Sequence, residues 1–213
     1  MSKLTIQDLN LSFVPQVTSQ DPLWQRCINL ALRSGSENQR YGALVVRNGK
    51  IIGQGWNRLL KKGEPFPFKT TFFLHAERAA IGDAMFAQTP DTICGAVVYV
   101  AGFLVKERHP LIRRAAVINM GTCVQCARLY ANHNLSVAFM SETGWIHLSG
   151  PKALQNAEMN AHILKERGIT RRQFRQEICL YAPVRMHGRA ASSTTKEKNQ
   201  HDEQRTKVFR RHD

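Results

Sequence analysis

Residues 21–168 alternate between segments with helical periodicity and segments typical of strands, and this order restricts the fold more than any other feature. Helices are predicted at 23–34, 75–87, 123–133 and 151–167, and strands at 41–47, 51–56, 95–101 and 135–140. The later strands are separated by helices, which is typical of parallel pairing, whereas the first two are close enough for a hairpin. The sequence therefore predicts an α/β fold, with a mixed sheet inside a three-layer α/β/α sandwich.

Short local signals predict where several of these elements begin and end. Asp21 followed by Pro22 is typical of a helix start, with Asp21 as the N-cap and Pro22 at the first helical position. Asn48 and Gly49 lie between the first two strands and predict a two-residue hairpin turn. Gly168 is placed to end the last helix.

The 213 residues suit one domain with extensions at both ends. We expect a lead-in segment at 1–20, a single domain at 21–180, and a basic, disordered tail at 181–213. The longest apolar run is too short to cross a bilayer as a helix, and the N-terminus lacks an apolar signal segment. We therefore expect a cytoplasmic protein with no membrane partner.

The chain is strongly basic, and the excess charge is not confined to the tail. It contains 30 lysines and arginines against 16 acidic residues, a formal net charge of +14. Residues 1–183 alone contain 22 basic and 12 acidic residues, so they carry +10. This charge favours a phosphorylated or polyanionic partner.

Two short motifs contain residues that suit metal chemistry. Cys123 and Cys126 are three residues apart, so a helix places both thiols on one face, at an N-terminus that favours thiolates. With a neutral imidazole from His75 they provide three zinc ligands and leave the fourth position for water, as in catalytic sites. Glu77, two residues after His75, can enter the same pocket and move protons without coordinating.

His75-Ala76-Glu77 with Cys123 to Cys126 resembles the cytidine and deoxycytidylate deaminase superfamily. The similarity covers about residues 21–168 and includes the segments 42–46, 51–57, 98–100, 126–128 and 135–139. It implies a zinc-dependent hydrolytic deaminase, in which zinc-bound hydroxide attacks the ring carbon that bears the amine and Glu77 shuttles protons. It also implies substrate contacts at Asn57 and Ala76, and a homo-oligomer.

The chain departs from the family pattern in two places. Thr122 precedes the first cysteine where the family usually has proline, and we expect this threonine to N-cap the helix. Residues 103–121 lengthen the interval between His75 and Cys123, and we expect this insert to line or cover the mouth of the pocket. Its basic residues are Lys106, Arg108, His109, Arg113 and Arg114.

Several alternatives stay open at this stage. The cysteine pair alone is also typical of a redox site, His133 could complete a closed structural zinc site, and the domain could bind without catalysing. Residues 59–74 and 145–169 resemble the deoxycytidylate or cytidylate deaminase branch of the family, and this resemblance implies a free cytosine nucleotide such as dCMP or CMP as the substrate. Residues 55–58 also resemble tRNA adenosine deaminases, so tRNA or single-stranded nucleic acid is the alternative substrate.

Overall fold

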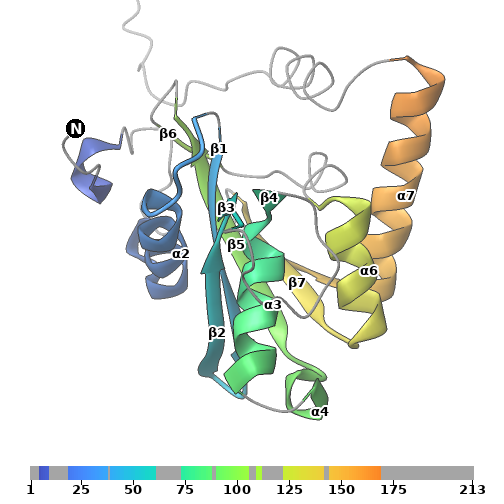
Figure 1. Ribbon diagram of the computed structural model, residues 1–213, viewed down its shortest axis with the longest axis horizontal. Helices are drawn as coiled ribbons and strands as arrows, with labels where there is room; N and C mark the ends of the chain where they lie inside the picture. Colours follow the sequence, from blue (N-terminus) through green and yellow to red (C-terminus); the bar gives the residue numbers. More distant parts are fainter. Residues whose placement is uncertain are drawn as a thin grey trace, which may run out of the picture. The chain divides into compact units, whose positions relative to one another are not determined.

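The computed structural model divides into two compact units, residues 1–179 and 180–213, and every residue it describes belongs to the first. The described residues are 5–9, 19–37, 39–60, 73–87, 90–105, 109–111, 122–141 and 144–168 (Figure 1). Most of the insert at 103–121 and the whole tail at 181–213 lie outside them, so the predictions for both stay untested. None of the helices in the described residues combines the length and apolar character that crossing a bilayer requires.

Helices and strands follow one another nearly as the sequence predicts. The helical elements are η1 (Ile6–Asp8), α2 (Pro22–Leu32), α3 (Ala76–Ala87), α4 (Pro90–Ile93), α6 (Val124–Asn132) and α7 (Gly150–Glu166). The strands are β1 (Gln39–Arg47), β2 (Lys50–Trp56), β3 (Arg58–Leu59), β4 (Phe73–Leu74), β5 (Val97–Leu104), β6 (His109–Leu111), β7 (Ser136–Ser141) and β8 (Gly144–Ser149). The sequence analysis did not predict β8 or the short strands β3, β4 and β6.

The main sheet is mixed, as predicted. Its strand order is β2-β1-β5-β7-β8, and β6 pairs with β5 near one end. β5 and β7 run parallel, since α6 connects them, whereas β1 is antiparallel to both β2 and β5. β8 returns antiparallel to β7 and forms one edge of the sheet.

The local signals at the element ends are confirmed. The Asp21 carboxylate accepts a hydrogen bond from the backbone N–H of Trp24 at 2.8 Å, which caps α2. Asn48 and Gly49 both have positive φ, at 50° and 73°, as a type I′ hairpin turn requires. Gly168, just after α7, also has a positive φ of 61°.

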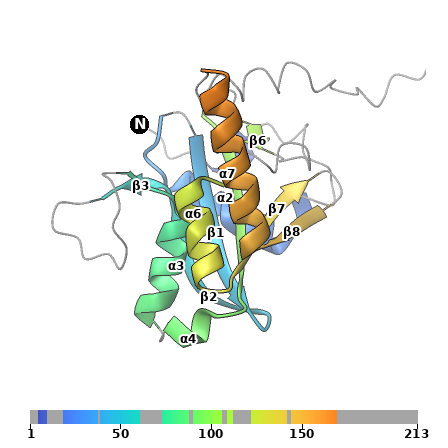
Figure 2. The same cartoon turned by 90° about the vertical axis from the view of Figure 1, so that its right-hand side faces the viewer.

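Helices cover both faces of the sheet, which confirms the three-layer sandwich. α3, α6 and α7 lie on one face and α2 lies on the other (Figures 1 and 2). Alternate residues of β1 point to opposite layers, because side chains alternate along a strand: Ala43 and Val45 pack in the larger core under α3 and α6, and Leu44 packs against α2. Leu9, from the predicted lead-in segment, is also buried in the α2 core.

Glycines in β2 let α3 approach the sheet closely. A Cβ atom at Gly55 would lie 2.5 Å from the backbone nitrogen of Ala80, and one at Gly53 would lie 2.4 Å from the carbonyl oxygen of Ala80. On the side of α3 that faces these glycines the residues are small, and they include Ala79 and Ala84. This close contact fixes the position of α3, and His75 immediately precedes α3.

Candidate zinc site

His75 lies between a short strand and a helix, and both restrain it. β4 ends at Leu74, which pairs with Arg58 of β3, and α3 begins at Ala76. The carbonyl oxygen of His75 accepts the first hydrogen bond of this helix, from the N–H of Ala79 at 3.0 Å. The predicted helix therefore begins one residue after His75, and the imidazole stands at its N-terminus.

Cys123 and Cys126 occupy the first turn of α6. The predicted cap at Thr122 is wrong: the N-cap is Cys123, whose backbone is extended (φ −77°, ψ 156°). Its sulfur accepts a hydrogen bond from the backbone N–H of Cys126 at 3.3 Å. A sulfur can take this role because the N–H groups of the first turn need an acceptor, and a thiolate supplies one. The residue that caps α6 is thus also a candidate metal ligand.

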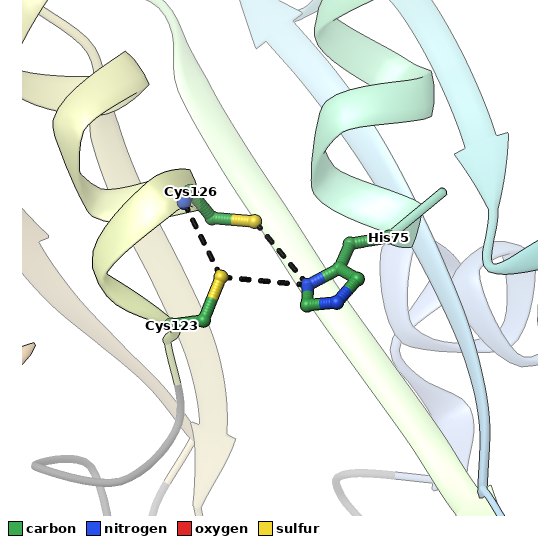
Figure 3. Close-up of side chains that lie close together, drawn as sticks. All are labelled: His75, Cys123 and Cys126. Atoms are coloured by element: carbon green, nitrogen blue, oxygen red, sulfur yellow. Dashed lines mark hydrogen bonds between the residues drawn. The ribbon is translucent and has the colours of Figure 1, made fainter. Parts of the chain in front are cut away.

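The three side chains converge on one point, although 48 residues separate His75 from Cys123. The Nδ1 atom of His75 lies 3.5 Å from each of the two sulfur atoms (Figure 3). With Zn–S near 2.3 Å and Zn–N near 2.0–2.1 Å, a tetrahedral ion separates these ligand atoms by about 3.6 Å. The donor set and the distance of Nδ1 from each sulfur therefore fit a zinc ion. All three ligand atoms lie within 4.8 Å of one another.

The electrostatics of the triad agree with a metal-binding role. Hydrogen bonding from Cys126 and from His75 lowers the pKa of the Cys123 thiol to about 3. The pKa of the Cys126 thiol is raised, first by its hydrogen bond with Cys123 and then by burial. The pKa of His75 is also raised, mainly by its hydrogen bond with Cys123. A bound zinc ion would deprotonate both thiols and take over the Nδ1 lone pair.

Two charged residues follow His75 in the first turn of α3, and both are buried. Glu77 is 6% exposed and Arg78 is 5% exposed. Among the described residues, the cluster of candidate ligand atoms consists of His75, Cys123 and Cys126 and does not include Glu77. Its negative charge acts on both His75 and Cys126, raising the pKa of each, so it lies in the electrostatic environment of the site.

The structure separates His133 from the triad. His133 is the C-cap of α6, whereas Cys123 is its N-cap, and the nine-residue helix between them is about 14 Å long. A closed structural site with His133 as fourth ligand is therefore wrong. The redox interpretation is also weakened, because it requires only the two cysteines and leaves the convergence of His75 on both sulfurs unexplained.

The two predicted substrate-contacting residues are both buried. The Oδ1 atom of Asn57 accepts from the Tyr41 N–H at 2.6 Å, and its Nδ2 donates to the Gln39 carbonyl at 2.8 Å. An amide has one further donor and one further acceptor position, so substrate contact stays a prediction. The methyl group of Ala76 points into the core, so a contact there would use its backbone N–H, which a helix leaves without an intrahelical partner.

Sequence reasoning missed a contact beside the triad. Arg78 Nη1 donates to Gln125 Oε1 at 2.8 Å, which links the helix after His75 to the helix of the cysteines. The available signal was an arginine between the buried alanines of α3, a position where a charged side chain needs a partner.

With this geometry in place, comparison with known proteins identifies the family. The model of the cytidine and deoxycytidylate deaminase zinc-binding region matches residues 18–140, more than half of the chain. The chain belongs to this family. The matched region contains His75, Glu77 and both cysteines, so the triad is the candidate zinc site of this deaminase domain.

Solved structures similar to this deaminase domain include a dCMP deaminase from the cyanophage S-TIM5. The form crystallised in complex with dCMP and dUMP is 25% identical, with a TM-score of 0.28, and the match covers 46% of this chain and 62% of that protein. The apo form is 23% identical, with a TM-score of 0.30, and the match covers 55% and 74% of the two chains. This chain thus spans less than two thirds of the length of the complexed phage enzyme.

Proposed function

We propose that this chain is a zinc-dependent hydrolytic deaminase that acts on a free cytosine nucleotide, such as dCMP or CMP. The observation that carries the proposal is the approach of His75 Nδ1 to within 3.5 Å of both cysteine sulfurs, beside the buried Glu77. Three protein ligands leave one coordination position for water, which is the arrangement of catalytic zinc sites. The family description, which names cytidine and deoxycytidylate, supports a cytosine base.

The reaction replaces the exocyclic amine by oxygen, so water is consumed and ammonia leaves. Zinc, when bound, supplies a Lewis acid that activates the attacking water. Glu77 accepts the proton that this water loses, donates it to the ring nitrogen, and then carries a proton to the departing amine. The low exposure of Glu77 keeps this carboxylate away from bulk water while it exchanges these protons.

Asn57 and Ala76 are proposed to hold the substrate. Asn57 is fixed by two hydrogen bonds to β1, so its remaining donor and acceptor positions have a defined direction. The Ala76 N–H lies at the start of α3, next to His75, where a helix offers donors to an acceptor on the ring. Because both groups are held in fixed positions, they would orient the base for reaction as well as bind it.

One observation favours a polynucleotide as the second candidate substrate. Arg33, the C-cap of α2, lies with its guanidinium 4.0 Å from the ring centroid of Trp56, the last residue of β2. Arg26, an exposed residue of α2, donates a hydrogen bond to the side chain of Gln54, which lies in β2 together with Trp56. Arginine and aromatic side chains together on a surface are typical of single-strand binding. Catalysis on a polymer would fall steeply with rising salt, because several phosphate contacts release counterions.

The experiment compares the wild type with Glu77→Ala on cytidine, deoxycytidine, their monophosphates, bulk tRNA and single-stranded DNA. Deamination adds about one mass unit, which mass spectrometry resolves. Conversion of a free monophosphate by the wild type alone supports the proposal. Conversion of a polymer alone favours the second candidate. No conversion by a zinc-loaded protein would overturn the proposed activity and favour a domain that binds without catalysing.

Three further proposals follow from the family resemblance and the composition. We propose a homo-oligomer, which light scattering of the purified chain would test. We also propose a cytoplasmic location and a role in nucleotide metabolism.

A further inference from the structure

The two helices that carry the candidate zinc ligands have different packing partners. α3, which follows His75, packs mainly on β2 and β1, whereas α6, which carries both cysteines, packs mainly on α7. Direct contact between α3 and α6 is slight by comparison. The triad therefore lies across a junction between two separately supported helices, and their relative position decides whether the ligand atoms can meet.

The hydrogen bond between Arg78 and Gln125 crosses this junction. Arg78 lies three residues after His75, about one helical turn along the same helix. Gln125 lies between Cys123 and Cys126 in the first turn of α6. The 2.8 Å bond from Arg78 Nη1 to Gln125 Oε1 thus joins a point one turn from the histidine ligand to a point between the two cysteine ligands.

The burial of the two partners differs, and the difference indicates a role beyond packing. Arg78 is 5% exposed, so its side chain is fixed by its surroundings. Gln125 is exposed, so general packing does not explain its position. A fixed, charged donor with a neutral acceptor on the neighbouring helix forms a charge-assisted bond of defined geometry.

We propose that Arg78 and Gln125 are positioning residues that hold α3 and α6 in register, so that His75 and the two cysteines are arranged for zinc before the ion binds. The proposal rests on the zinc site of the proposed function, and it adds the two residues that preorganise this site. Partners outside the ligand set typically change metal affinity by about 10- to 100-fold when they are removed. Neither residue is assigned a contact with the substrate.

The test measures zinc affinity on the full chain, stripped of metal and titrated in competition with a zinc-binding indicator. Gln125→Leu keeps the approximate size of the side chain and removes the acceptor, and Arg78→Met removes the donor. Each should weaken zinc binding about 10-fold. The double variant should bind zinc about as tightly as the more affected of the two single variants, because both changes remove the same bond. Gln125→Glu keeps an acceptor oxygen and should stay within about threefold of the wild type.

The matched control is Arg128→Ala, three residues after Gln125 on the same helix. Arg128 is exposed and forms a surface ion pair with Glu158 at 3.8 Å, so its removal should leave zinc affinity unchanged. Because Gln125 is also exposed, Gln125→Leu should fold, and circular dichroism of the metal-free protein would check this. The readout needs no substrate and is therefore independent of which nucleotide is deaminated.

Three outcomes would overturn the proposal. Wild-type affinity in Gln125→Leu would show that the bond does not position the ligands. Effects of the two single variants that add fully in the double variant would show that the residues act separately. If metal-free Arg78→Met is less thermally stable but binds zinc with unchanged affinity, Arg78 contributes to folding stability and does not position the ligands. In these cases the proposed function stands, whereas a wild type that binds no zinc would overturn both proposals.

Discussion

The sulfur of Cys123 accepts a hydrogen bond from the backbone N–H of Cys126 at 3.3 Å, so one thiol both caps α6 and faces the candidate metal position. The two roles have different chemical requirements. A cap needs only an acceptor, which oxygen provides as well as sulfur. A zinc ligand of this type needs a thiolate. The two roles can therefore be separated by a single substitution.

Cys123→Ser should abolish zinc binding while the metal-free domain stays folded. Serine is a preferred N-cap, so the unfolding midpoint of the metal-free variant should stay close to that of the metal-free wild type. Zinc content, measured by elemental mass spectrometry after dialysis against a weak chelator, should fall from one ion per chain to near zero. Cys94→Ser changes an exposed cysteine and should keep full zinc content. Full occupancy in Cys123→Ser would contradict the ligand assignment.

Glu77→Gln should leave zinc bound and remove most of the activity. The amide keeps the shape of the side chain but cannot accept and release protons, and a general acid–base typically contributes about 10²- to 10⁴-fold to the rate. We expect kcat to fall within that range on the substrate identified above, with zinc content unchanged. Asp83→Asn makes the same chemical change at an exposed position of α3 and keeps an acceptor for the Gln54 N–H. Near-normal turnover by Glu77→Gln would refute the proton-transfer role.

Chelation should lower the stability of the whole domain, because zinc holds the N-termini of α3 and α6 together. A ligand that binds only the folded state stabilises it by about 2.7 kcal/mol at 100 times its dissociation constant. Removal of the ion should therefore shift the thermal midpoint downward by several degrees, and added Zn²⁺ should restore it. The comparison is made by calorimetry at one protein concentration. An unchanged midpoint in protein shown to contain zinc would indicate that the ion does not contribute to folding stability.

The sequence predicts best what depends on neighbouring residues. Asp21 and Pro22 define a helix start within four residues, and Asn48 with Gly49 define a turn within two, so both could be predicted without tertiary information. The triad was predictable for another reason. Zinc restricts its ligands to a few residue types at short spacings, and the family resemblance indicated that His75 and the distant cysteine pair belong to one site.

Features that depend on tertiary contacts could not be predicted from the sequence. β8 escaped detection because Trp145, Ile146 and Leu148 give no clear alternation, and its pairing with β7 decides its structure. The N-cap at Cys123 could not be predicted, because cysteine is not among the residues that usually cap helices. The link between Arg78 and Gln125 joins residues 47 positions apart, and no periodicity of either helix indicates it.

Gly55→Ala should destabilise the domain by about 1–3 kcal/mol, the usual effect of overpacking a well-packed contact. The added methyl group would lie 2.5 Å from both the Ala79 Cβ and the Ala80 backbone nitrogen, so α3 would have to move away from β2. Because His75 immediately precedes α3, zinc affinity should fall as well. Gly35→Ala is the matched control, since a Cβ there meets nothing within 4 Å. Equal urea midpoints for the two variants would contradict the close packing of α3 on the sheet.

Asp21 connects α2 to β8, and this connection can be measured. One carboxylate oxygen caps the helix at Trp24, and the other accepts from the Trp145 indole N–H at 3.2 Å, in β8. Asp21→Ala should cost about 2 kcal/mol, roughly half from the cap and half from the second bond. Trp145→Phe should cost less, because the edge-on contact of its ring with Tyr99 is largely kept.

A double-mutant cycle isolates the bond between Asp21 and Trp145. The double variant should be less destabilised than the sum of the two single variants by about 0.5–1.5 kcal/mol, because each single change already removes the shared bond. Denaturant unfolding of the four proteins gives these values. Ser is also a good N-cap but is too short to reach both partners, so Asp21→Ser should keep the cap and lose only the coupling to Trp145. Full additivity would show that α2 and β8 are not linked through this carboxylate.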